Sequence, residues 1–164
     1  MLKKVVENAL NKQIAMEEFA ARSYLSLAVW ADHESYEGAA KYLYLQNQEE
    51  IGHMRKIIQF VLDAGGKPEI TTYQEPLPQP KSYKDLFKIG LEHEKAVTKS
   101  IHKIAELAWK EKDMATFNFI QWFIEEQVEE EDQFQTVLAK LDIIEKHGGS
   151  LYMLDRELGM RGAK

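Results

Sequence analysis

The sequence predicts an all-α protein in which four long helices form one bundle. Apolar residues recur at spacings of three and four almost throughout, which is typical of amphipathic helices. All four prolines lie between Pro68 and Pro80, so residues 1–67 and 81–164 are free to be helical. With 164 residues, 45% of them hydrophobic, the chain is long enough to bury one core, and we assign residues 1–164 to a single domain.

Turn-forming residues divide the chain into four long helices and a short fifth. The predicted spans are 4–33, 36–64, 83–110, 113–146 and 150–159. We expect Ser35 to cap the second helix. Ser82 followed by Asp85 is a start signal for the third helix, and Asp113 suits the N-cap of the fourth.

The lengths of the connections predict how these helices are joined. Short connections make the first two helices one antiparallel hairpin and the next two another, within a bundle that spans 4–146. The segment 66–82 spans roughly 55–60 Å when extended, against about 42 Å for a helix of about 28 residues. It therefore serves as a long crossover between the second and third helices, which then run parallel. A disordered linker between two separate hairpins is the alternative.

Composition excludes several functional classes. Acidic residues outnumber basic ones by 27 to 21, and the basic residues form no stripe that could follow a phosphate backbone, so we expect no nucleic-acid partner. The chain has no cysteine, which excludes disulfides, thiolate nucleophiles and cysteine-ligated clusters. Since no apolar run approaches the roughly 18 residues that cross a bilayer, we expect no membrane partner and a cytoplasmic location.

The apolar stripe of each long helix turns polar near its middle. The interrupting residues are Glu17, then Glu50 and His53, then Glu94, and finally Gln127 and Glu130. Buried carboxylates need compensation, and no lysine or arginine lies in these stripes, so metal cations are the expected partners. Glu50 and His53 lie one turn apart, and mixed oxygen and nitrogen ligands suit iron, manganese or zinc. A rotation of all four helices that exposes these residues is the alternative.

These residues resemble the ferritins, and most closely the bacterial non-haem ferritins. The matching positions, in order, are Glu17, Tyr24, Glu50-x-x-His53, Glu94 and Gln127-x-x-Glu130. The resemblance covers essentially the whole chain and implies a ferritin-like four-helix bundle. It also implies a ferroxidase that oxidises Fe(II) to Fe(III) with O₂ or H₂O₂ and stores ferric mineral in a homo-oligomeric 24-subunit shell.

The resemblance also implies a ligand set for two iron ions. The residues that would hold one iron are Glu17, Glu50 and His53. Those that would hold the other are Glu50, Glu94 and Glu130, with Gln127 close by. Bacterioferritins have a second Glu-x-x-His here, so an all-oxygen second site should bind iron more weakly. No haem is expected, because Gly52 occupies the part of the motif where bacterioferritins carry the ligating methionine.

A second acidic group lies beside the first. By the same resemblance, Glu49, Glu126 and Glu129 form a third iron site next to Glu130, whereas a solvated acidic face is the usual interpretation of such a run. Tyr24 is either a core aromatic residue whose hydroxyl needs a partner or an electron donor during O₂ reduction. Both interpretations remain open.

The final helix and the function each leave an alternative. A helix over 150–159 is too short to be stable alone, so its apolar side must dock. The resemblance implies packing around the fourfold axes of the shell, and docking on its own subunit is the alternative. Rival functions are a detoxifying peroxidase of ferritin-like fold and a metal-free bundle that binds partner helices.

Overall fold

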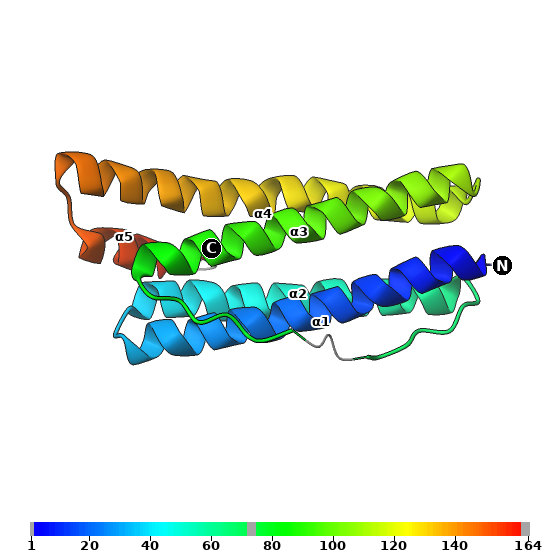
Figure 1. Cartoon of the computed structure of the whole chain (residues 1–164), viewed down its shortest axis with the longest axis horizontal. Helices are drawn as coiled ribbons and strands as arrows, with labels where there is room; N and C mark the ends of the chain where they lie inside the picture. The colour runs from blue at the N-terminus through cyan, green and yellow to red at the C-terminus, as the bar shows by residue number, and fades with distance from the viewer. Residues whose placement is uncertain (1, 72–74, 162–164) are drawn as a thin grey trace.

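The computed structural model describes residues 2–71 and 75–161, and these residues form helices and no strands (Figure 1). The five helices of this part of the chain are α1 (Lys4–His33), α2 (Glu37–Asp63), α3 (Tyr83–Lys110), α4 (Met114–His147) and α5 (Leu151–Leu158). Each end lies within one residue of its predicted position. The all-α class and the four-helix bundle with a short fifth helix are therefore confirmed.

The described parts of the crossover, residues 66–71 and 75–82, lie along the bundle between the end of α2 and the start of α3 (Figure 1). As a result α2 and α3 run parallel, while α1 with α2 and α3 with α4 form antiparallel hairpins. Asn11 of α1 fixes the start of the crossover. Its amide donates to the Lys67 carbonyl and its side-chain oxygen accepts from the Glu69 N–H, both at 3.0 Å. The start of the segment is thus bound to the bundle, which argues against a free linker between two hairpins.

Two of the three predicted helix caps are confirmed. The Ser82 hydroxyl accepts from the Asp85 N–H at 3.1 Å, and the Asp113 carboxylate accepts from the Thr116 N–H at 3.0 Å. The predicted cap at Ser35 is wrong. Ser35 has a φ of 65° and occupies the left-handed position that the tight α1–α2 turn requires.

The cap of α2 comes instead from α5. The Asp155 carboxylate accepts the N–H groups of Gly38 and Ala39, each at 2.8 Å. A Cβ atom on Gly38 would lie 1.6 Å from the Asp155 carbonyl oxygen, so only glycine permits this close approach. Leu154 and Leu158 are buried beneath the helix. α5 therefore contacts its own subunit, and packing around the fourfold axes of the shell stays a prediction.

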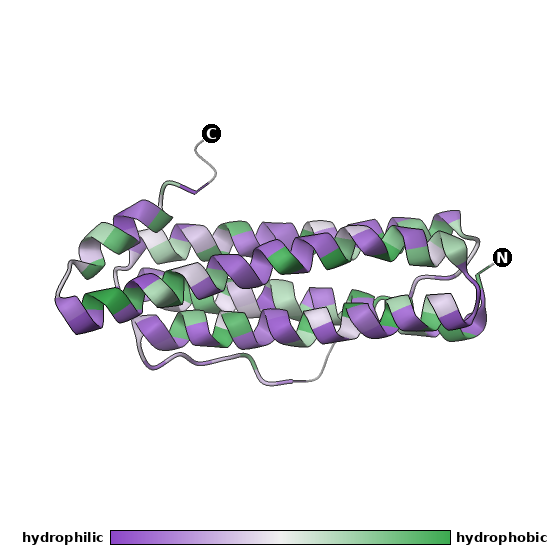
Figure 2. Ribbon diagram, turned by 90° about the horizontal axis from the view of Figure 1, so that it is seen from above, coloured by the Kyte–Doolittle hydropathy of each residue, from purple (hydrophilic) through white to green (hydrophobic). Residues whose placement is uncertain are grey.

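The apolar core is divided into two clusters. One contains Leu43, Phe87 and Phe134, and the other contains Ile57 and Phe123. In each long helix the segment between the two clusters carries the polar residues of the predicted site, and we call this segment of the bundle the polar layer. Hydrophilic and hydrophobic residues alternate along the helices, as Figure 2 shows, and none of the described helices is long and apolar enough to cross a membrane.

Candidate metal centre

Each of the four long helices contributes one glutamate to the polar layer. The exposed fractions are 0% for Glu17, 1% for Glu50, 0% for Glu94 and 3% for Glu130. The helices are therefore not rotated so as to place these residues on the surface. Four buried carboxylates at one depth are unfavourable unless protons, hydrogen bonds or cations compensate their charge.

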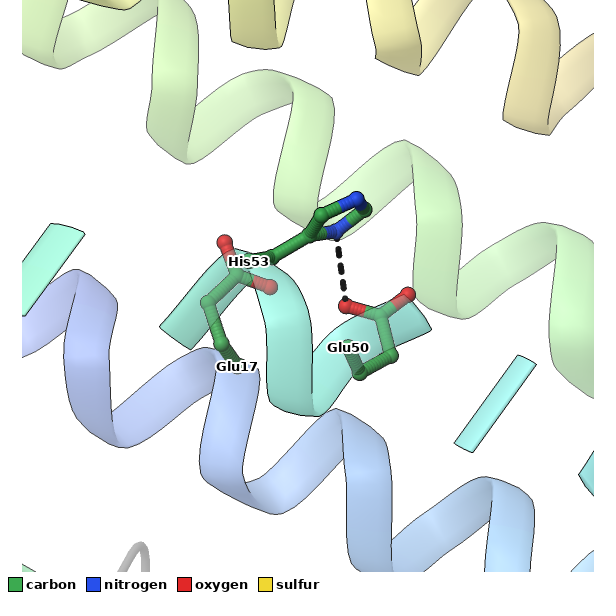
Figure 3. A group of neighbouring side chains, drawn as sticks. All are labelled: Glu17, Glu50 and His53. Atoms are coloured by element: carbon green, nitrogen blue, oxygen red, sulfur yellow. Dashed lines mark hydrogen bonds and ion pairs between the residues drawn. The ribbon is translucent and has the colours of Figure 1, made fainter. Parts of the chain in front are cut away.

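Three of the predicted ligands form a compact cluster. Glu17 of α1 faces Glu50 and His53 of α2, and one ligand atom from each lies within 4.8 Å of the others (Figure 3). His53 Nδ1 lies 3.3 Å from Glu50 Oε2. Glu17 Oε1 accepts from the Gln13 amide at 2.8 Å, but Glu17 Oε2 is buried and has no hydrogen-bond partner among the described residues. This donor set fits one transition-metal ion.

The other two carboxylates are held by hydrogen bonds. Glu94 accepts from the Tyr24 hydroxyl through Oε1 and from the Gln127 amide through Oε2, the latter at 3.0 Å. Glu130 Oε2 accepts from the Gln46 amide at 2.7 Å. Glu94 and Glu130 thus share the polar layer with the cluster, but their ligand atoms lie outside it.

The predicted outer acids lie toward the surface of the bundle. Glu126 Oε2 is 4.0 Å from His53 Nε2, which places it next to the cluster. Glu49 lies one residue before Glu50 and pairs with Arg161 at 2.8 Å. Glu129 is exposed. The structure therefore places Glu126 beside the cluster, and none of the three acids is itself buried.

The same architecture occurs in known proteins. Residues 7–144 match the family of the ferritin-like domain. The chain belongs to the ferritin family. It is 39% identical over 161 residues to the bacterial non-heme ferritin of Staphylococcus haemolyticus, covering 98% of this chain and 97% of that protein. It is 35% identical over 164 residues to the probable bacterial non-heme ferritin-like protein of Haemophilus influenzae, covering 100% of this chain and 99% of the other.

Solved structures agree with this assignment. The open pore ferritin of the archaeon Archaeoglobus fulgidus superposes with a TM-score of 0.93 at 38% identity and covers 98% of both chains. The ferritin of Chlorobium tepidum superposes with a TM-score of 0.87 at 34% identity and covers 99% of both. The ferritin fold therefore extends over nearly all of the described chain, including α5.

Burial controls the protonation of this ferritin's carboxylates. It raises the pKa of Glu17 and of Glu50 well above the ordinary value, and neighbouring negative charge raises both further. The pKa of Glu94 rises to about 7 through burial, although the hydrogen bonds it accepts lower it. Burial and the charge of Glu94 together raise the pKa of Glu130 to about 7. Metal ions that replace these protons would remove the electrostatic cost.

Aromatic residues pack beside the polar layer. The ring of Trp122 meets His53 edge-on at 5.5 Å, and His93 meets Tyr24 edge-on at 5.7 Å. Burial lowers the pKa of His93 to about 4, so this imidazole is neutral at ordinary pH.

Sequence reasoning missed the residues that orient the ligands. Gln13 and Gln46 lie in the same stripes as Glu17 and Glu50, but the sequence alone does not show which carboxylate each amide binds. Arg161 lies beyond the last helix, and no local pattern points to its contact with α2. Its position depends on how α5 docks.

Proposed function

We propose that this ferritin is an iron-storage ferroxidase whose dinuclear centre lies in the polar layer. The residues of the proposed centre are Glu17, Glu50, His53, Glu94, Gln127 and Glu130. The observation that carries the proposal is the cluster of Glu17, Glu50 and His53, in which a fully buried carboxylate oxygen has no partner among the described residues. Such an atom is costly in a protein interior unless a proton or a metal cation binds to it.

The ligands divide between two iron ions. Glu17 and His53 would hold the first, Glu94 and Glu130 the second, and Glu50 would bridge them. Carboxylates favour Fe(III) over Fe(II) because they supply negative charge. Two Fe(II) ions together lose two electrons, which with two protons convert H₂O₂ to two water molecules or O₂ to H₂O₂. The protein supplies the geometry and the charge.

Tyr24 acts on the second iron site in this proposal. Its hydroxyl donates to Glu94, so it orients one carboxylate oxygen and leaves the other side of the carboxyl to Gln127. A buried phenol with this single strong acceptor is well placed for a positioning role. Electron donation by Tyr24 during O₂ reduction stays a prediction.

We place the third iron site at Glu49, Glu126 and Glu129. Glu126 supports this assignment because its carboxylate lies 4.0 Å from His53 Nε2, on the outer side of the cluster. Iron that leaves the dinuclear centre would meet these acids next. The exposure of Glu49 and Glu129 suits a transient site rather than a tight one.

The proposed assembly is a homo-oligomeric cage of 24 subunits in the cytoplasm, with ferric mineral inside. The Archaeoglobus fulgidus relative is an open pore ferritin, which supports a cage whose interior is reached through openings in the shell. The chain-length match to bacterial non-heme ferritins supports the same size of building block.

The test measures the rate of Fe(II) oxidation by the metal-free protein, first with O₂ and separately with H₂O₂. The iron retained per subunit is then determined. Glu94→Ala should slow oxidation, while Glu92→Ala, which removes an exposed acid on the same helix, should not. Fast oxidation with little iron retained would favour the detoxifying peroxidase. A protein that neither oxidises Fe(II) nor retains iron in any of these assays would favour the metal-free bundle that binds partner helices.

A further inference from the structure

Arg161 reaches the polar layer from the end of α5. Its guanidinium donates through Nη1 to the side-chain oxygen of Gln46 and through Nη2 to Glu49 Oε2 at 2.8 Å. The guanidinium carbon lies 4.3 Å from the centre of the Tyr42 ring, and the side chain is 21% exposed. A cation stacked on an aromatic ring and bonded to two side chains has a fixed position.

The docking of α5 places this guanidinium. Asp155 binds the first turn of α2, and the Lys41 ammonium of α2 donates to the Gly159 carbonyl at 2.7 Å. Leu158 is buried, and its carbonyl accepts from the Arg161 N–H at 3.1 Å. The chain therefore holds Arg161 against the turn of α2 that carries Gln46 and Glu49.

Gln46 connects Arg161 to a proposed iron ligand. A side-chain amide has its acceptor and its donor on opposite atoms, so a bond at the oxygen fixes the direction of the NH₂ group. Because the oxygen accepts from Arg161, the NH₂ group points at Glu130 Oε2, 2.7 Å away. This arrangement holds one oxygen of Glu130 and leaves the other for metal.

Glu49 connects the same guanidinium to the proposed outer site. A metal ion at this carboxylate must either share it with Arg161 or displace the guanidinium, and in both cases it is repelled by the fixed positive charge. The cluster of Glu17, Glu50 and His53 is not in hydrogen-bond contact with Arg161. The charge therefore acts most strongly on the outer acids.

We propose that Arg161 is a positioning residue that fixes Glu130 through Gln46 and competes with metal for Glu49, so that the dinuclear centre fills before the outer site. This inference rests on the proposed function. It assigns to the C-terminal end of the chain a role in the order of metal loading, which is separate from the stabilising role of α5.

The test is a calorimetric titration of Zn²⁺ into the metal-free full-length chain. We compare the parent with Arg161→Gln, which removes the charge, and with Arg161→Lys, which keeps it. Arg156→Gln is the matched control, because it removes an exposed charge from the same end of the chain. Zinc reports binding without oxidation, so the readout does not depend on ferroxidase activity.

Arg161→Gln should bind the third zinc ion about three- to tenfold more tightly, since the competing charge is gone. The first two ions should bind no more tightly than in the parent, and more weakly where Glu130 contributes. In Arg161→Lys and Arg156→Gln, the third zinc ion should bind as weakly as in the parent. Tighter binding at the outer site together with weaker binding at the dinuclear centre would indicate competition by Arg161. A structural defect would instead lower the zinc affinity of all sites together.

Unchanged affinity for the third ion in Arg161→Gln, or equal weakening at every site, would overturn the inference alone. A parent chain that binds fewer than two zinc ions would contradict the proposed function and remove the basis of the inference with it. The two failures are therefore distinguishable in one experiment.

Discussion

Replacing Glu130 by glutamine should stabilise the metal-free protein, although it removes an iron ligand. Burial and the Glu94 charge raise the pKa of Glu130 from an ordinary value of 4.5 to about 7. That difference corresponds to about 3 kcal/mol of unfavourable free energy when the carboxyl ionises in the folded state. Glutamine keeps the shape and can still accept from the Gln46 amide, but it carries no charge.

The sign of the effect depends on pH. A raised pKa in the folded state means that the folded protein holds more protons than the unfolded chain between pH 4.5 and about 7. The parent therefore loses stability relative to Glu130→Gln as the pH rises through this window. We expect a gain of about 2–3 kcal/mol at pH 8 and less than about 1 kcal/mol at pH 5.

The assay is thermal unfolding of the metal-free protein by circular dichroism at both pH values. For a chain of this size the gain corresponds to a midpoint about 5–10 °C higher at pH 8. Glu125→Gln, which removes an exposed charge from the same helix, is the control and should shift the midpoint little. A Glu130→Gln protein no more stable than the parent at pH 8, or equally stabilised at pH 5, would refute the electrostatic cost assigned to this carboxyl.

Three further changes have definite expected results. His53→Ala should slow Fe(II) oxidation at least about tenfold in stopped-flow measurements while the shell still assembles, because it removes the sole nitrogen donor of the proposed ligand set; an unchanged rate would remove His53 from the centre. Glu49→Ala combined with Glu126→Ala should preserve fast oxidation of about the first two irons per subunit but change the stoichiometry and later turnover, and an equal stoichiometry in titrations would count against the third site. Asp155→Ala should lower the free energy of unfolding by about 1–2 kcal/mol in urea titrations, since it uncaps α2; an unaffected midpoint would contradict the docking of α5.

Periodicity was sufficient to predict the fold and the buried carboxylates. The stripes of α1 to α4 are apolar except at one level, and a stripe that must face the core fixes the rotation of its helix. Once the rotation is fixed, Glu17 and Glu94 can only point inward. The long crossover followed from its length alone, because seventeen residues reach from one end of the bundle to the other.

Contacts between distant segments were beyond sequence reasoning. Local rules favoured Ser35 as the cap of α2, whereas the structure uses Asp155, more than a hundred residues away. The position of Arg161 depends on the same docking of α5 on α2, which no periodic pattern specifies. The pairing of Tyr24 with Glu94 depends on the relative level of α1 and α3, so the sequence could give only the need for a partner.

The most direct measurement is anomalous diffraction at the iron edge from crystals of the metal-free protein soaked anaerobically with Fe(II). We predict two anomalous peaks in the polar layer of each subunit, one between Glu17, Glu50 and His53 and the other between Glu50, Glu94 and Glu130. Peaks confined to the surface of the bundle, or none in the polar layer, would contradict a dinuclear ferroxidase centre in this chain.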